Sequence, residues 1–537
     1  MNRYLISDLS LRVTKGEELE PRGFIADALA VDISRIKNAV IVKRSIDARK
    51  KPEVFWVYSI AVTIDEKDKE LYKRLNRKFS VSPYRPKLYS FENPKKIKGS
   101  SEGGRPVVIG AGPAGIFCAY LLAVNGLRPI VIERGKPAGE RLADVKAFWE
   151  TGVLSPDSNA SFGEGGAGTF SDGKLNTLNK DKYGRIGFIL RTFVKFGADE
   201  SVLYDNKPHI GTDKLVDILP AIREDIIKMG GEYRFNTKVT GLDTKNGRLA
   251  GVRLSNGETM ECREAVLAIG HSARDTYRWL YDMGIPMEAK AFAVGFRIEH
   301  PQSMINISQY GREAADILAP ASYKLVSHHN DRGVYSFCMC PGGYVVDSST
   351  EDGGLVVNGM SYSQRSGANA NSAIVISADE KDFGGNDPMS AIAFQRKLEE
   401  RAFKLCDGAI PQQLLGDYIR GTVSLSYGDF PSAHKGRVGF ANMRGLLPQA
   451  LEEAYFLAIC EYAKKIHGFD RYDAIMSGVE SRTSSPVRII RDEGAESVIR
   501  GLYPCGEGAG YAGGITSAAA DGLKCAEEII KKRLDDE

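Results

Sequence analysis

The residues with the clearest chemistry lie in the run 107–115, where three apolar residues lead into Gly110, Gly112 and Gly115. Glycines at this spacing let a tight backbone turn approach a phosphate, and the helix that follows offers free N–H groups to the anion. A second apolar run ends in Glu133, 18 residues after Gly115, close to the roughly 20 expected for a carboxylate that binds a ribose. The run therefore predicts a βαβ unit that holds a dinucleotide.

The same glycine pattern recurs at 163–168 and at 508–513, in different contexts. The glycines at 163–168 suit a loop whose backbone lies against a phosphate or a flat ring, because a Cβ would hold the chain away. The glycines at 508–513 lead into a predicted helix over 515–532, after which no strand is predicted. This last pattern predicts a helix whose N-terminus points at the cofactor and stabilises its negative charge by about 1 kcal/mol.

The intervening sequence shows whether the dinucleotide is FAD or NAD, because FAD needs an extended site assembled from distant segments. A helix is predicted over 212–229, and a strand over 232–235. Three short runs at 238–242, 249–254 and 259–263 are separated by Asn-Gly pairs, which are strong hairpin signals. A three-stranded meander followed by a buried strand over 265–270 is therefore expected, and it favours non-covalently bound FAD.

These residues resemble the FAD-dependent oxidoreductases built like glutathione reductase. In that superfamily a meander leads to an Ala-Thr-Gly strand, here Ala268-Ile269-Gly270, and a final strand ends in glycine and an acid, here Gly506-Glu507. The runs 162–174, 270–276 and 481–486 look like a bacterial family known only as uncharacterised FAD-dependent dehydrogenases. The resemblance implies the α/β class, with a Rossmann-type FAD-binding domain.

The glycine patterns and the resemblance together assign a set of cofactor-binding residues along the whole chain. They are Gly110, Ala111, Gly112, Pro113, Ala114, Gly115, Glu133, Arg134, Arg141, Gly165, Gly166, Gly168, Thr169, Lys174, Val239, Ala268, Gly270, Gly506, Glu507, Gly513, Gly514 and Ile515.

Two absences narrow the chemistry. Disulfide reductases of the superfamily carry a cysteine pair just after the first βαβ unit, whereas residues 134–200 contain no cysteine. A second nucleotide fingerprint in the right context is also missing, so NAD(P)H is expected only as a transient electron donor. The 8 cysteines are scattered apart from Cys338 and Cys340, which predicts reduced thiols and no metal site.

Residues 1–99 form a separate basic unit, with 22 Lys and Arg against 13 Asp and Glu. A helix over 25–37 and strands over 40–43 and 54–60 predict a small ferredoxin-like α+β domain, joined through a linker over 87–105. The FAD-binding domain is expected over 100–290 and again over 481–537. An α+β substrate domain is expected to be inserted between them, over 291–480.

The basic bend at 49–52, with Phe55, Trp56 and Tyr58 nearby, has the ingredients of a nucleic-acid surface. The alternative is a solvated hairpin whose aromatic residues face the core, which is the more common arrangement in strands. An RNA-binding or RNA-modifying flavoprotein is therefore a second hypothesis, with nucleic acid an unlikely partner that is not ruled out.

The inserted region should supply the substrate residues. Strands are predicted over 293–300 and 335–343, and a polar loop with Asn358, Arg365 and residues 369–372 is expected to converge on an oxygen-rich ligand. Cys338 and Cys340 lie at same-face strand positions, as a redox pair or as inert buried thiols.

The catalytic candidates are His271, Arg297 and Arg482. The histidine suits acid–base work, and the arginines suit a carboxylate or a reduced flavin. The alternatives are a histidine bonded to a neighbouring carbonyl and structural ion pairs.

No run approaches the 18 or so apolar residues of a membrane helix, and the first residues lack a signal-peptide pattern. A cytoplasmic protein without a membrane partner is expected. The leading hypothesis is hydride transfer between FAD and a small organic substrate, with a flavin-holding scaffold without turnover as a third possibility.

Overall fold

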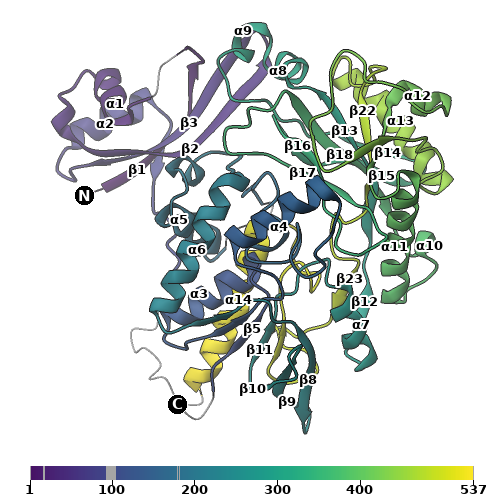
Figure 1. Cartoon of the computed structure of the whole chain (residues 1–537). Coiled ribbons are helices and arrows are strands. Elements are labelled where there is room, and N and C mark those ends of the chain that lie inside the picture. Colours follow the sequence, from purple (N-terminus) through teal and green to yellow (C-terminus); the bar gives the residue numbers. More distant parts are fainter. Residues whose placement is uncertain (1, 16–18, 92–103, 178–179, 181, 536–537) are drawn as a thin grey trace.

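The protein is described by a computed structural model that covers residues 2–15, 19–91, 104–177, 180 and 182–535. At its centre is a five-stranded parallel sheet with the strand order β24-β11-β5-β6-β7 (Figure 1). The strands are β5 (Val107–Ile109), β6 (Ile130–Ile132), β7 (Glu232–Arg234), β11 (Ala265–Leu267) and β24 (Leu502–Pro504). The predicted βαβ unit is thus present, and a parallel sheet of this kind needs helices or other layers on both faces.

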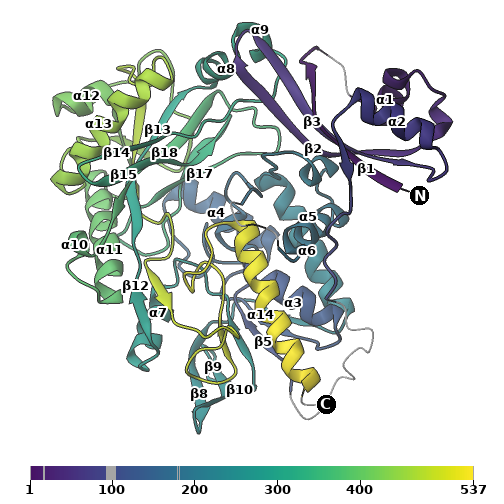
Figure 2. The ribbon, with the colours of Figure 1, turned by 180° about the vertical axis from the view of Figure 1, so that it is seen from behind.

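Alternate residues of the central strands bury against two different layers. Val108, Val131 and Val266 face a helical layer, whereas their neighbours Val107 and Ile109 face the meander. Figure 2 shows α14 running beside α3 in the helical layer. The helices of this layer are α3 (Pro113–Val124), α5 (Arg185–Lys195), α6 (Thr212–Lys228) and α14 (Ile515–Asp535).

The meander on the opposite face consists of β8 (Val239–Lys245), β9 (Arg248–Leu254) and β10 (Thr259–Glu261), as predicted. Its first turn places Asn246 and Gly247 at positive φ, 53° and 73°, which is the backbone that Asn-Gly hairpin turns adopt. The predicted helix over 212–229 is also confirmed, because α6 ends at Lys228.

Between β11 and β24 the chain forms a seven-stranded sheet with the order β14-β15-β18-β13-β22-β19-β21, here called the cap sheet. Its strands are β13 (Phe292–Pro301), β14 (Val326–His329), β15 (Arg332–Cys340), β18 (Asn369–Ala378), β19 (Ile410–Leu414), β21 (Val438–Phe440) and β22 (Ile475–Glu480). Helices α11 (Pro388–Leu405) and α13 (Gln449–Lys465) pack on it through one apolar cluster.

A small sheet connects the cap sheet to the part of the chain that carries the central parallel sheet. It contains β16 (Tyr344–Asp347), β17 (Val357–Met360) and β20 (His434–Lys435), and it packs on α4 (Ala138–Thr151) through Trp149, Phe170 and Met360. The prediction of a polar loop near Asn358 is wrong, because Asn358 lies in β17 and residues 369–372 begin β18. Continuous strand pairing extends through both segments.

The N-terminal unit has the element order βαββαβ and an antiparallel sheet with the order β2-β3-β1-β4. Its elements are β1 (Asn2–Arg12), α1 (Pro21–Leu29), β2 (Ile36–Lys50), β3 (Glu53–Ile64), α2 (Lys69–Lys78) and β4 (Val81–Pro83). The predicted helix over 25–37 is confirmed only for residues 25–29, because α1 ends at Leu29 and its C-cap Ala30 has a φ of 49°. Beyond it, Ile33–Arg35 form a short 3-10 helix and Ile36 begins β2. Part of the predicted linker, 92–103, lies outside the described residues.

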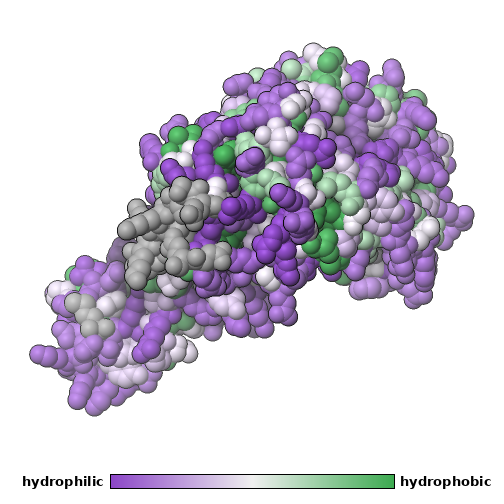
Figure 3. Space-filling view, turned by 90° about the horizontal axis from the view of Figure 1, so that it is seen from below, coloured by the Kyte–Doolittle hydropathy of each residue, from purple (hydrophilic) through white to green (hydrophobic). Residues whose placement is uncertain are grey.

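The long β2–β3 hairpin contacts the rest of the chain through the edge of β2 and through an apolar cluster. Arg44 donates its backbone N–H to the Tyr204 carbonyl at 2.7 Å, and Val54 packs with Ala314 and Leu318 beside α8 (Gln302–Tyr310). The surface of the unit seen in Figure 3 is mostly hydrophilic, in keeping with its basic composition. Among the described residues, no helix is both long enough and apolar enough to span a bilayer.

Candidate cofactor site

The first glycine turn requires glycine for steric reasons. Gly110 has a φ of 102°, and a Cβ there would lie 2.4 Å from the Ala268 carbonyl oxygen. A Cβ on Gly115 would lie 1.9 Å from the Gly110 carbonyl oxygen. Gly112 is the N-cap of α3, and no side chain caps this end of the helix. The first N–H groups of α3 are therefore available to an anion.

The second glycine loop lies directly on the first turn. Gly165 donates its N–H to the Ala111 carbonyl at 2.7 Å, and a Cβ on Gly166 would lie 3.1 Å from the Cα of Gly112. A Cβ on Gly168 would lie 3.0 Å from Ile515, the first residue of α14. Three segments distant in sequence, 110–115, 163–168 and the start of α14, thus converge. Pro113 and Ala114 lie in this contact, beside Gly168 and Gly506 respectively.

Arg141 holds the second loop in place from behind. Its buried guanidinium donates to the carbonyls of Asn159, Glu164 and Gly166 at 2.7 to 2.9 Å, and burial lowers its pKa to about 10. Thr169 is also buried and bonds to the Glu164 carbonyl at 3.2 Å. Both residues were expected to bind the cofactor, and the geometry gives them the role of shaping the loop that would do so.

Glu133 is the predicted ribose-binding carboxylate, and it is 5% exposed. One oxygen accepts the N–H groups of Gly135 and Gly163, both at 2.9 Å, and the other accepts that of Ala111 at 2.7 Å. A carboxylate has about four acceptor positions. One position therefore remains for a hydroxyl group, while the other three fix both glycine segments around it.

Arg134 and Val239 lie at the same end of the site. The Arg134 guanidinium pairs with Asp275 at 3.0 Å and lies 4.4 Å from the centre of the Phe162 ring. With Lys238, the neighbour of the buried Val239, it lines a cavity of about 420 Å³ that reaches the cap region.

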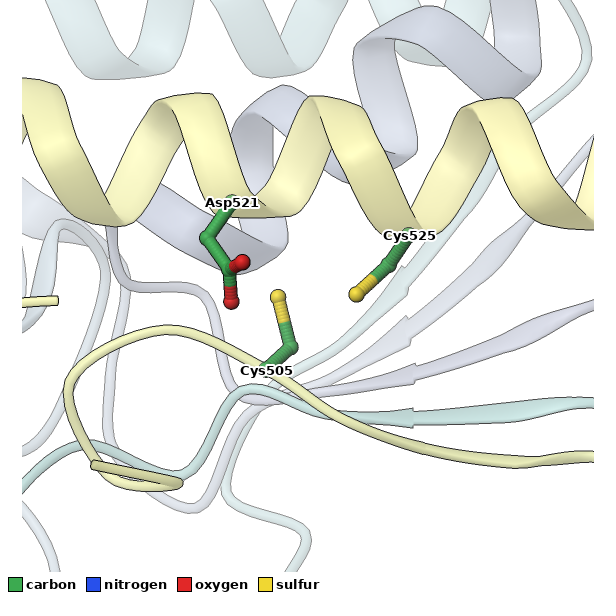
Figure 4. Close-up of side chains that lie close together, drawn as sticks. All are labelled: Cys505, Asp521 and Cys525. Atoms are coloured by element: carbon green, nitrogen blue, oxygen red, sulfur yellow. The ribbon is translucent and has the colours of Figure 1, made fainter. Parts of the chain in front are cut away.

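The C-terminal turn is positioned by a side chain that the sequence patterns did not indicate. Asp521 on α14 accepts the Gly506 N–H at 2.8 Å and pairs with Arg491 at 2.6 Å. Figure 4 shows the Asp521 carboxylate beside the thiols of Cys505 and Cys525. The interaction with the Cys525 thiol and burial raise the pKa of Cys505, and the Arg491 guanidinium neutralises the carboxylate, so the trio is not suited to a metal ion.

Three predicted glycines border open space, in contrast to the crowded ones. A Cβ on Gly270, Gly513 or Gly514 would meet no atom within 4 Å. Gly513 and Gly514 are exposed and lead directly into α14. Burial raises the pKa of the nearby Glu507 carboxyl to about 7, although Lys290 opposes the shift. An extended diphosphate cofactor fits this site, because backbone N–H groups, a buried carboxylate and a bare glycine wall are all present.

Lys174 does not reach freely into this site. Its ammonium group pairs with Asp172 at 3.4 Å and donates to the Met339 carbonyl of β15. Arg365 pairs with the same Asp172. The arginine expected at the ligand loop and the lysine expected at the cofactor therefore join the second glycine loop to the cap sheet instead.

Arg297 is fully buried, and all five of its N–H groups are used. Nε and Nη2 bind Glu480, Nη1 binds Asn371 and the Cys338 carbonyl, and Nη2 also binds Asn358. Asn358 and Asn371, two of the polar residues expected to converge on a ligand, thus bind Arg297. Arg297 is therefore not expected to bind the carboxylate of a substrate, because none of its N–H groups remains free.

His271 and Arg482 lie together, with Ser272 between them. The Nδ1 atom of His271 lies 2.8 Å from the Ser272 hydroxyl, which accepts from Arg482 at 3.2 Å. Burial and the positive charge of Arg482 lower the pKa of His271 to about 4, so the ring is neutral at pH 7. Arg482 also pairs with Glu399 at 2.6 Å.

Glu399 was missed by the sequence reasoning, and it is the centre of a buried network. It binds Arg482 and Arg274, the latter at 2.7 Å, and these two guanidinium groups hold its pKa well below the usual range. A signal was present, because Gln395 and Glu399 are polar residues four apart on the buried face of α11. Polar residues on an apolar helix face indicate a buried network.

The fold and site define a protein that binds a flavin dinucleotide. Residues 104–278 match the family described as pyridine nucleotide-disulphide oxidoreductase, and residues 291–483 match that described as FAD-dependent protein, C-terminal domain-like. Residues 5–63 match a domain of unknown function.

An uncharacterized protein of Clostridium beijerinckii is 46% identical over 512 residues, which are 93% of each chain. The chain belongs to an uncharacterised family of FAD-dependent oxidoreductases, and FAD is its cofactor.

Two solved structures are weakly similar to this chain. Glycine oxidase from Bacillus cereus is 12% identical, with 80% of this chain and 95% of that chain covered and a TM-score of 0.31. L-Proline dehydrogenase from P. horikoshii is 14% identical, with 81% and 95% covered and a TM-score of 0.33. At these scores neither comparison bears on the reaction.

Proposed function

We propose that the protein transfers hydride between bound FAD and a small organic substrate that binds beneath the cap sheet. The observation that carries this proposal is the convergence of 110–115, 163–168 and the start of α14 beside an open glycine wall. FAD supplies the two-electron chemistry when bound. Two contacts support a substrate position next to the second glycine loop: Lys174 reaches the Met339 carbonyl of the cap sheet, and Arg365 of the cap region pairs with Asp172.

Particular residues are proposed for each part of the cofactor. The uncapped N-terminus of α3 would bind the diphosphate, and the free acceptor position of Glu133 would bind a ribose hydroxyl. The N-terminus of α14 would lie at the flavin ring, with Gly513 and Gly514 giving close access. Neutral His271 is proposed as a group that exchanges a proton near the cofactor, with Arg482 fixing Ser272 beside it.

The division into residues 1–99, 100–290, 291–480 and 481–537, with a ferredoxin-like first unit and an inserted substrate domain, is part of the same proposal. The βαββαβ order of the first unit and the separate apolar clusters support it. NAD(P)H is proposed only as a transient donor, since the remaining glycine patterns have no second βαβ context.

The RNA alternative is not proposed, because two of the three hairpin aromatics, Trp56 and Tyr58, already pack within the protein. Tyr58 is buried, and the Trp56 ring is covered by the guanidinium of Arg44 at 5.1 Å. Stacking with a base would require both rings to be free.

The test is a titration of the protein with FAD, followed by anaerobic stopped-flow reduction with NADH, NADPH, amino acids and hydroxy acids. Stoichiometric FAD binding and rapid bleaching by one class of reductant are expected. FAD binding without reduction by any compound would leave only a scaffold, and the hydride-transfer proposal would be rejected.

A further inference from the structure

A second cavity, of about 820 Å³, is lined by segments of the chain other than those assigned to the cofactor. It is bordered by Lys51 at the tip of the β2–β3 hairpin, by α8, and by the last turn of α13. The hairpin tip meets the region of α8 in Figure 1. None of the residues assigned to FAD lines this cavity. We call it the interface groove.

The interface groove gathers positive charge from three separate parts of the fold. Lys51 comes from the hairpin, Lys464 and Lys465 come from α13, and Arg471 comes from the loop that follows. Asp429 is the acidic residue among the lining residues, and it pairs with Arg471 at 3.1 Å. A groove lined in this way attracts an anion.

These cations have donors to spare. The ammonium group of Lys464 makes no hydrogen bond or ion pair within the described part of the chain. Lys465 uses two of its three N–H groups, on Glu461 at 2.6 Å and on the Val326 carbonyl at 3.0 Å. Lys51 uses one, on the Ser308 carbonyl. An ammonium group has three donors, so several N–H groups remain for a ligand at one mouth of the groove.

Beside the polar residues Ser303, Ser308 and His467, the groove has an apolar part, which limits the kind of anion. Pro301, Met304, Ile307 and Phe430 form this part of the wall. The volume is within the roughly 300–1,000 Å³ of small-molecule sites, so it suits a flat ring system with attached phosphates. Glu461, Asp473 and Asp429 offset part of the positive charge, which suits a few phosphates better than the long anionic track of a nucleic acid.

The lysines of α13 have a simpler explanation, because cations in the last turn stabilise a helix. That explanation does not account for Lys51 and Arg471, which reach the same groove from two other elements. We propose that the interface groove binds a nucleoside phosphate, whose phosphates contact Lys51 and Lys464 and whose base lies on Met304 and Ile307. The bound molecule would bridge the N-terminal unit and the cap region.

The test uses the full chain loaded with FAD, so that the cofactor site is closed to the probe. Isothermal titration with ATP, inorganic triphosphate and adenosine measures binding at low and high salt. We expect ATP to bind more tightly than either fragment, with an affinity that falls as salt rises. Lys51→Glu combined with Lys464→Glu should raise the Kd for ATP by about tenfold or more.

Lys397→Glu is the matched control, since Lys397 is exposed on α11 and outside the groove. It should leave the Kd unchanged. If the double variant unfolds, Lys464→Gln replaces it, with a smaller increase expected. No binding of ATP at about 1 mM, equal weakening by Lys397→Glu, or tighter binding of polyuridylate that displaces ATP would each overturn the proposal. FAD content and flavin reduction are measured separately, so failure here leaves the cofactor site unaffected.

Discussion

The FAD-binding half and the cap region place their functional groups by opposite means. In the FAD-binding half, backbone meets backbone: Gly110 contacts Ala268, and Gly166 contacts Gly112. In the cap region, buried ion pairs such as that between Arg297 and Glu480 hold the side chains in position. The first arrangement tolerates no added atom, whereas the second tolerates no lost charge.

The two arrangements have different energetic consequences. A buried ion costs several kcal/mol of desolvation, which is offset only when its hydrogen bonds are complete. Arg297 meets that condition with five donated bonds. A glycine contact carries no such cost, but it leaves no room for relaxation. The cap should therefore be sensitive to charge removal and pH, and the glycine turn to volume.

The largest effect is expected at the buried carboxylate of the cap network. Glu399→Gln leaves Arg274 and Arg482 without their shared anion, and breaking such a buried pair costs about 3–5 kcal/mol of unfolding free energy. Urea unfolding measures the loss. Glu351→Gln is the matched control, because Glu351 binds the same Arg274 but its side chain is 31% exposed, and it should cost clearly less.

The pH dependence gives a second readout of the same network. The folded state lowers the pKa of Glu399 below its unfolded value of about 4.3. Its contribution is therefore complete above that value and is lost as the pH falls. The stability difference between the wild type and Glu399→Gln should shrink below about pH 4. A difference that stays constant from pH 7 to pH 3 would contradict the ion-pair interpretation.

The glycine turn should give the next largest effect, and it separates folding from binding. Gly115→Ala places a Cβ 1.9 Å from the Gly110 carbonyl oxygen, so the apo protein should lose about 1–3 kcal/mol by overpacking. Gly513→Ala meets no atom within 4 Å. It should leave the thermal midpoint of the apo protein unchanged and weaken FAD binding.

Equal loss of apo stability in the two glycine variants would show that the open and crowded glycines do not differ. Unchanged FAD affinity in Gly513→Ala would remove this glycine from the cofactor site.

The difference between the two regions also explains what the sequence could reveal. The turn at 110–115, the meander and the helix after Gly514 were predictable because each depends on neighbours in sequence. The partner of Gly506 was not, because Asp521 reaches it from the middle of α14, and no motif marks that position. The spacing of glycines in the sequence predicts backbone geometry, but it does not show which distant side chain supports that backbone.

The side-chain partners in the cap region could not be predicted for the same reason. Asn358, Arg365 and residues 369–372 were expected to converge on a ligand, but Asn358 and Asn371 bind the buried Arg297. A polar residue in a strand looks identical in sequence whether it binds a ligand or a buried neighbour. In the N-terminal unit, residues 31–37 were predicted to continue a helix, yet Ala30 at φ 49° ends α1. Ile33–Arg35 then form only a short 3-10 helix, and the strand β2 begins at Ile36.

The smallest effect is expected where the N-terminal unit docks, and it compares two arginines of one hairpin. Arg44 lies between the Trp56 and Tyr204 rings and pairs with Asp205 through two bonds, at 2.6 and 2.9 Å. Its side chain is 25% exposed. Arg44→Ala should cost about 1–2 kcal/mol, through the charge-assisted bonds and the ring contacts.

Arg49 is 88% exposed and pairs with Asp47 of the same hairpin, so Arg49→Ala should cause no measurable change. Hydrogen exchange at the amide of Arg44, which bonds the Tyr204 carbonyl, should quicken in Arg44→Ala and stay unchanged in Arg49→Ala. Equal exchange in both variants would mean that the hairpin docks through Val54 and its apolar neighbours alone. In that case the guanidinium would add nothing to the contact that brings Lys51 to the interface groove.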